Sequence, residues 1–139
     1  MGWDIYIGEW RARASADDEP IDHIEDGDAP AFNGDDAGRT NRRQPSYVEW
    51  DQFCVATGLK ALFHGENGLF AEHPGTVQLT KKHAQEIHRA LGRYTLKYPN
   101  AESTFLGGER DKNLARLEWL VWWVDWALTN CKRPAIHNR

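Results

Sequence analysis

The chain has very few cysteines and no long apolar run. Cys54 and Cys131 are the only two cysteines in 139 residues, and they stand 77 positions apart. This number excludes a disulfide-dense scaffold, and the spacing matches no zinc motif, so we interpret both as small core residues in a reducing compartment. No segment approaches about 18 consecutive apolar residues, and residues 1–16 lack a basic stretch followed by an apolar run. We therefore expect no membrane span and a cytoplasmic location.

Common signatures of catalysis and of nucleic-acid binding are also missing. The sequence contains no G-x-x-x-x-G-K-[ST], G-x-G-x-x-G, G-x-S-x-G or H-E-x-x-H motif. No Lys/Arg-rich block is long enough for a dedicated nucleic-acid footprint. His83 and His88 are five residues apart, which is about 140° around a helix, so they cannot share a metal ion as an i, i+4 pair does. We expect neither a cofactor nor a bound metal.

Charge is unevenly distributed along the chain. The net charge is −4, yet 11 of the 21 acidic residues and only 2 of the 17 basic residues fall within residues 1–36. An irregular acidic segment at about 15–45 mixes these acids with proline and glycine and shows no helical period. It is either an acidic tail with its own partner or a loop folded back over the basic remainder.

The length predicts a single domain, 1–139, with one core.

Tryptophan is abundant, and four of the seven tryptophans fall within residues 119–126. On a helix over about 109–131, aliphatic side chains cover roughly half of the circumference and the four indoles crowd a second arc of about 100°. Asp111, Glu118 and Asp125 form a carboxylate stripe along one seam between these arcs. Because a helix that is apolar nearly all round belongs inside a fold, we predict a central helix whose indoles are core. The alternative is an indole cage for a cation or a stacking platform for a base.

Local signals predict the remaining elements. Alternating apolar and polar residues predict an N-terminal strand over about 3–13. A capping box at residues 46–49 predicts a helix that ends near Gly58, and Thr80 caps a second helix that ends before Pro99. Short extended segments fit near 21–24 and 77–79, and one helical turn fits near 59–63. We predict an α+β fold in which the N-terminal strand and one or two short extended segments pack on three helices, with the Trp-rich C-terminal helix at the centre.

The candidate ligand-binding residues lie at the end of the acidic segment. Arg39, Arg42 and Arg43 precede the predicted helix start at Ser46 and Tyr47. Unpaired N–H groups at a helix start, beside guanidinium groups, can hold an anion such as phosphate. Alternatively, the arginines pair with the acidic segment or with the carboxylate stripe.

Histidines and aspartates supply the candidate catalytic groups. His73 or His83, with carboxylates such as Asp26 and Asp28, could act as acid, base or metal ligand on a phosphorylated substrate. This hypothesis gains support if the side chains meet within hydrogen-bond reach in one cleft, and it loses support if they are scattered. Asp22, Asp26 and Asp28 resemble calcium ligands in composition only, because the D-x-[DN]-x-[DN]-G order is missing, so we interpret their segment as a solvated acidic loop.

Several segments together carry a resemblance to known proteins. They are MGWDIYIG at 1–8, DAPAF at 28–32, PSY at 45–47 with the W, F and C of 50–54, EHPG at 72–75 and NCKRP at 130–134. In this pattern the chain resembles small uncharacterised proteins carried by bacteriophages. The resemblance spans most of the chain and implies a setting, the cytoplasm of an infected bacterium, but it brings no activity or catalytic residue.

We therefore expect a phage-borne accessory protein of non-enzymatic type that binds a host protein or a small anionic ligand, for example a nucleotide. The ligand would bind through the 26–47 segment, because a long polar stretch there leads into an arginine-flanked helix start. The first alternative is a small hydrolase or transferase that acts on a phosphorylated substrate through the histidines and aspartates named above. The second is a structural virion component, which would form a stable oligomer with an exposed apolar patch.

Overall fold

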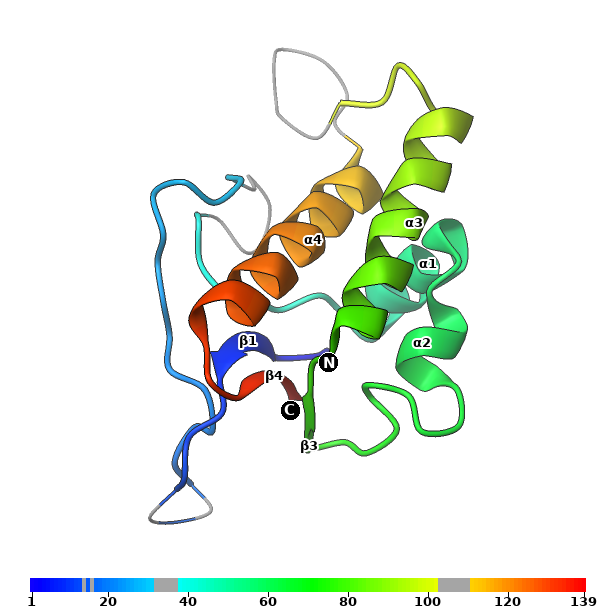
Figure 1. Ribbon diagram of the computed structural model, residues 1–139. Helices are drawn as coiled ribbons and strands as arrows, with labels where there is room; N and C mark the ends of the chain where they lie inside the picture. Colours follow the sequence, from blue (N-terminus) through cyan, green and yellow to red (C-terminus); the bar gives the residue numbers. More distant parts are fainter. Residues whose placement is uncertain (14, 16, 32–37, 103–110) are drawn as a thin grey trace.

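The chain folds into an antiparallel sheet with helices packed on one of its faces (Figure 1). The computed structural model describes residues 1–13, 15, 17–31, 38–102 and 111–139. Within these residues the elements are β1 (Ile5–Glu9), β2 (Arg42–Arg43), α1 (Tyr47–Thr57), α2 (Lys60–His64), β3 (Gly75–Gln78), α3 (Lys81–Lys97), α4 (Lys112–Asn130) and β4 (Pro134–Asn138). The predicted α+β class is confirmed, and α4 is the tryptophan-rich C-terminal helix.

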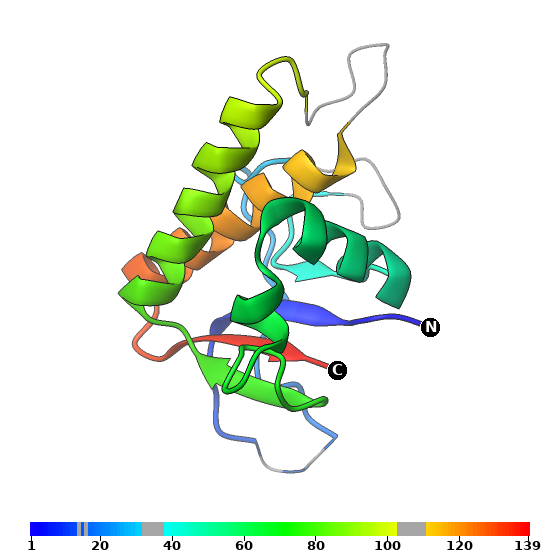
Figure 2. The ribbon, with the colours of Figure 1, turned by 90° about the vertical axis from the view of Figure 1, so that its right-hand side faces the viewer.

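The sheet brings the two ends of the chain together at its centre. Its strand order is β2-β1-β4-β3, and each neighbouring pair is antiparallel (Figure 2). β1 ends at Glu9, short of the predicted limit near residue 13, because the strand opposite begins at Pro134, the partner of Glu9. Beyond this point the chain turns away, and the Arg11 N–H donates to the Pro20 carbonyl at 2.8 Å.

The sequence does not predict β4. Pro134 is the first residue of this strand, a position at which a strand tolerates a residue without an N–H. Only Ile136 in the segment is a strong strand former, so the period-two signal is too short to detect. Its five residues are all buried because β1 and β3 pair with both edges.

The helix boundaries follow their caps. The Ser46 hydroxyl accepts from the Glu49 N–H at 3.1 Å, and Gly58 ends α1 in the left-handed region at φ 75°, both as predicted. Thr80 caps α3 as predicted, and the His83 side chain completes its capping box. α4 begins at Lys112 after the N-cap residue Asp111; the predicted start near residue 109 lies outside the described residues.

α4 is the central helix, as predicted. It lies beside α3 and above the sheet, and it packs against β1, β4, α1 and α3 (Figure 1). Trp119 and Trp123 are buried, whereas Trp122 and Trp126 are half-buried at the edge of the same core. The Trp119 indole N–H donates to the Thr40 carbonyl at 2.7 Å, so the helix also fixes the strand at the sheet's edge.

No helix in the described ranges is long and apolar enough to cross a membrane.

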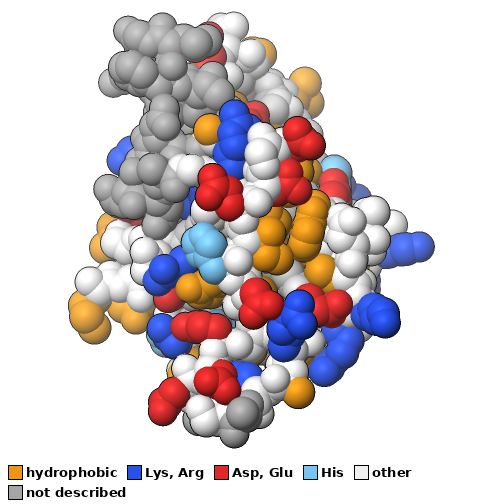
Figure 3. Space-filling view, turned by 90° about the vertical axis from the view of Figure 1, so that its left-hand side faces the viewer, with side chains coloured by type: hydrophobic (Ala, Val, Ile, Leu, Met, Phe, Trp, Pro, Cys, Tyr) orange, Lys and Arg blue, Asp and Glu red, His pale blue; other side chains and the backbone are white. Residues whose placement is uncertain are grey.

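The described part of the acidic segment passes from the outer face of the sheet, at Ile21, to the main core, where Ile24 and Ala29 pack. Its described part contains no strand at 21–24, because Ile21 instead fills a small second core with Tyr6 and Ala135. Asp22 pairs with Arg11 at 2.6 Å, and Glu19 pairs with Arg139 at 2.7 Å. Acidic and basic side chains accordingly lie next to one another on this side of the molecule (Figure 3).

Candidate functional site

Five aromatic rings meet where the N-terminal residues pass the start of α1. The Trp3 ring centroid lies 5.3 Å from Tyr47, 5.5 Å from His64, 5.1 Å from Phe70 and 4.3 Å from His73. We call these five residues the Trp3 cluster. Phe70 is buried and anchors the cluster to the core, whereas Tyr47 and His73 are exposed at its rim. The cluster therefore presents rigidly backed rings to solvent.

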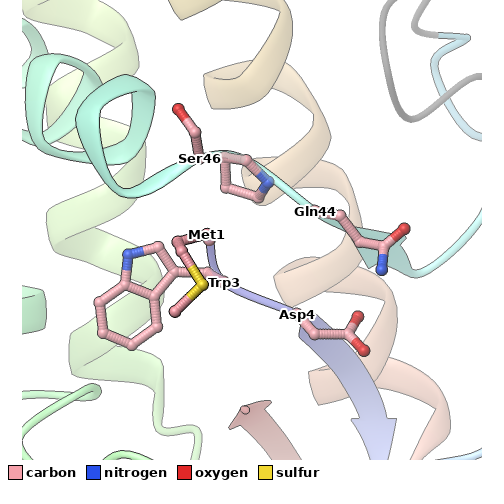
Figure 4. A pocket seen from close by; sticks show the side chains of 7 residues that line it. Met1, Trp3, Asp4, Gln44 and Ser46 are labelled. Atoms are coloured by element: carbon pink, nitrogen blue, oxygen red, sulfur yellow. The ribbon is translucent and has the colours of Figure 1, made fainter.

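A pocket of about 320 Å³ adjoins the Trp3 cluster. Figure 4 shows the Met1 and Trp3 side chains on one side of the N-terminal residues, and Asp4 and Gln44 on the other. We call this cavity the N-terminal pocket; it is lined by Met1, Gly2, Trp3, Asp4, Gln44, Pro45 and Ser46. Two backbone bonds hold its walls together, from the Trp3 N–H to the Pro45 carbonyl at 2.9 Å and from the Tyr47 N–H to the Met1 carbonyl at 3.4 Å.

The electrostatics of the N-terminal pocket do not exclude an anion. Among the described residues that line it, Asp4 is the only acid, and Arg42 neutralises it through bonds of 2.8 and 3.0 Å to its two carboxylate oxygens. Ser46 is the N-cap of the 11-residue helix α1, so the positive end of the helix dipole lies at the pocket wall. The net local field is therefore neutral to positive.

His73 is held between Tyr47 and the last residue of β4. Its Nε2 lies 3.3 Å from the Tyr47 hydroxyl, and its Nδ1 lies 2.7 Å from the Asn138 side-chain oxygen. Asn138 is fully buried, so a buried hydrogen-bond partner fixes the orientation of the histidine ring. The arrangement resembles the hydroxyl, base and orienting group of an activated nucleophile.

His64 sits deeper in the Trp3 cluster and has a different role. Its Nε2 accepts from the Trp50 indole N–H at 3.0 Å, which requires a lone pair on that nitrogen. Burial, and then the nearby Lys60 ammonium, lower the pKa of His64. His64 is thus a neutral acceptor that orders the aromatic core.

The predicted arginines direct their guanidinium groups to partners within the protein. Arg42 binds Asp4, which lies outside the acidic segment and the carboxylate stripe. Arg43 is buried, donates to the carbonyls of Gly38, Thr40 and Arg42 at 2.8–3.1 Å, and stacks on the Trp119 ring. Arg39 donates to the carbonyl of Ala29. Of the five predicted ligand-binding residues, only Ser46 and Tyr47 border the N-terminal pocket and the Trp3 cluster.

The predicted catalytic residues do not converge. His73 belongs to the Trp3 cluster, whereas His83 caps α3. The Asp26 carboxylate accepts from the Asp28 N–H at 2.9 Å in a local turn. Within the described ranges, no hydrogen bond or ion pair joins these aspartates to either histidine, so the contacts of the structure lend no support to an acid–base site of His73 or His83 with these carboxylates.

Two of the three carboxylates in the stripe of α4, Asp111 and Asp125, bind side chains of α3. Asp111 accepts from the Tyr94 hydroxyl at 2.6 Å, and Asp125 pairs with His88 at 2.8 Å.

In the described parts of the chain, no group of three or more metal-ligating side chains is arranged to hold a metal ion. Burial raises the pKa of Cys54 to about 12 and that of Cys131 to about 11, so neither thiol is a ready nucleophile.

Sequence reasoning missed Trp3 as a member of this site and Asn138 as the partner that orients His73. Trp3 was assigned to the first strand and to the core, and the period-two pattern contains no sign that its ring lies against a histidine 70 residues away. Asn138 lies in the strand that local signals do not predict. A search for histidines flanked by turn residues, such as Glu72-His73-Pro74-Gly75, would have identified the rim of the site but not its geometry. No family model matches the chain, and neither does any curated protein or solved structure.

Proposed function

We propose that this chain is a binding protein for a small anionic ligand that also carries a flat ring, such as a nucleoside monophosphate. The ligand would occupy the N-terminal pocket and stack on the Trp3 cluster, at the C-terminal end of the 26–47 segment. The setting that fits this role is that of a phage-borne accessory protein in the cytoplasm of its host.

One observation carries the proposal: the N-terminal pocket joins an exposed aromatic rim to the start of a helix. Its volume, about 320 Å³, is at the lower end of the range for small-molecule sites, about 300–1,000 Å³. The neutralised Asp4 and the α1 dipole favour a negative group, while the half-buried Trp3 and the exposed Tyr47 supply aromatic rings beside it. The dispersal of His83, Asp26 and Asp28 gives the hydrolase or transferase alternative no comparable support.

The test is a titration with four nucleoside monophosphates, their nucleosides and inorganic phosphate, followed through the indole and backbone N–H resonances. We expect a saturable shift of the Trp3 indole and of residues 46–48 with a monophosphate, and a weaker response to the nucleoside or to phosphate alone. Loss of one stacked base costs about 1–3 kcal/mol, so Trp3→Leu should weaken binding about tenfold.

Trp10→Leu is the matched control. Trp10 is a half-buried tryptophan that lies under Arg133 and outside the N-terminal pocket. The proposal fails if no compound in the panel shifts the Trp3 indole, or if the two substitutions weaken binding equally.

A further inference from the structure

The orientation of the Asn138 amide fixes the protons around His73. The Asn138 Nδ2 donates to the Glu72 carbonyl at 3.0 Å and to the Gly75 carbonyl at 3.4 Å, so both of its hydrogens are used. Its Oδ1 is the atom that faces His73 Nδ1, at 2.7 Å. An amide oxygen only accepts, so His73 Nδ1 must carry the hydrogen.

The free lone pair of His73 is therefore directed at a phenol. In the neutral ring with Nδ1 protonated, Nε2 is the acceptor, and the group 3.3 Å from it is the Tyr47 hydroxyl. Tyr47 must then donate to Nε2. A hydroxyl, a base that can take its proton, and a group that orients the base are the three parts of an activated nucleophile, and separations slightly above 3.2 Å are common before substrate binds.

Tyr47 is both accessible and well held. Its side chain is 38% exposed, and it is the first residue of α1, whose N-cap bond fixes the backbone there. The Trp3 ring contacts Tyr47 edge-on and also lies against His73, which limits the motion of both rings. A small electrophile can reach the phenol oxygen while the base stays in place.

We propose that Tyr47 is a nucleophile that accepts an acyl group from an activated ester, with His73 as its base. The Tyr47 oxygen forms a bond to the carbonyl carbon while its proton passes to His73 Nε2. The bond from that carbon to the leaving oxygen breaks, and the leaving alkoxide or phenoxide takes the proton from Nε2. The products are an O-acyl-tyrosine and an alcohol or phenol, and Asn138 acts as a positioning residue throughout.

This inference rests on the proposed function only for its location, because both use the rim of the N-terminal pocket. The probe is p-nitrophenyl acetate, a neutral ester that needs no affinity for an anion site. Nitrophenol release is followed by absorbance, and the acetylated residues are mapped and timed by mass spectrometry. A negative ligand titration thus leaves this test valid, and a negative acetylation test leaves the binding proposal standing.

The chain contains its own reference for reactivity. Tyr98 is 43% exposed, and its ring contacts are with Tyr94 and Lys97 rather than with a histidine. In the folded wild-type protein we expect Tyr47 to be acetylated at least about tenfold faster than Tyr98, because a positioned general base contributes about 10²–10⁴ in rate. Equal rates at the two tyrosines would overturn the proposal without any variant.

Variants separate catalysis from support of the fold. His73→Ala should reduce the Tyr47 rate to that of Tyr98. Free imidazole in the buffer should then raise the Tyr47 to Tyr98 ratio again, which a purely structural histidine would not allow. An unchanged Tyr47 to Tyr98 ratio in His73→Ala would also overturn the assignment.

Discussion

Asn41 shows how much of this fold depends on one polar side chain. It is fully buried beside β1, and its amide makes three hydrogen bonds of 2.8 Å. The oxygen accepts from the Ile24 N–H, and the nitrogen donates to the carbonyls of Ile7 and Asp22. Residues 22–24 of the acidic segment are thereby bonded to β1 at the edge of the sheet.

We predict that Asn41→Ala lowers the free energy of unfolding by about 2–4 kcal/mol, because it leaves three backbone groups without their partner. Urea unfolding at constant pH measures the change. Asn130→Ala is the matched control, since the Asn130 amide makes one exposed bond to the Trp126 carbonyl, and it should cost less than about 1 kcal/mol. Similar losses in the two variants would show that the amide network is not what holds the segment.

The residue scale is also where sequence reasoning is weakest. Arg42 and Arg43 are adjacent and chemically alike, yet one forms a part-buried ion pair with Asp4 and the other lies buried against Trp119. Alternation in β2 sends their side chains to opposite faces of the sheet, a consequence that follows only once the strand is known. Because β2 has two residues, no periodic signal could reveal it beforehand.

At the scale of elements, predictions succeeded where the signal was local. The N-cap Ser46, the Gly58 terminus and the Thr80 cap each depend on residues within one helical turn, and each is confirmed. β4 was not predicted because its stability comes from pairing with β1 and β3, which are distant in sequence. The predicted end of β1 was wrong for the same reason, because the paired strand β4 determines where β1 ends.

The start of α4 offers an element-scale prediction. Asp111 caps the helix by accepting from the Leu114 N–H at 2.9 Å, and it also accepts from the Tyr94 hydroxyl of α3. Asp111→Ala should cost about 1–2 kcal/mol of unfolding free energy, because it removes a cap. Asp111→Asn should recover most of this loss, since asparagine is an equally good N-cap residue.

Asp125 in the same carboxylate stripe is the control for that measurement. Its pair with His88 is about half exposed on both sides, so Asp125→Ala should cost no more than about 1 kcal/mol. Thermal or urea unfolding of the three variants ranks them directly. A larger loss for Asp125→Ala than for Asp111→Ala would mean that the helix start is not the stabilising feature.

At the scale of the molecule, the candidate site is a product of the whole topology. The N-terminal residues, the start of α1, the connection after α2 and the end of β4 all contribute to it, so the site forms only after β1 and β4 have paired. Local patterns identified Ser46, Tyr47 and His73 separately and for different reasons. They come together only through contacts between residues that are far apart in the sequence. From the sequence, Ser46 and Tyr47 therefore entered the ligand-binding hypothesis, and His73 entered the catalytic one.

The histidines give the whole molecule a defined acid sensitivity. Burial is the first cause that lowers the pKa of His64, His83 and His137 below the ordinary value of 6.5. Below about pH 6.5 the unfolded chain therefore binds more protons than the folded one, so stability falls as the pH falls toward the folded-state pKa values. Above that pH range these groups are neutral in both states, so they do not make the free energy of unfolding depend on pH.

We predict that the free energy of unfolding is nearly constant from about pH 8 to 7 and decreases between about pH 6.5 and 5, a range that avoids most carboxylate titration. Because desolvation is not screened by ions, the slope should persist in about 1 M salt, where the Debye length is about 3 Å. Replacing His64 and His137 together by glutamine should remove much of it. Urea unfolding across this range provides the measurement, and a flat profile, or one abolished by salt, would assign the acid response to surface charge instead.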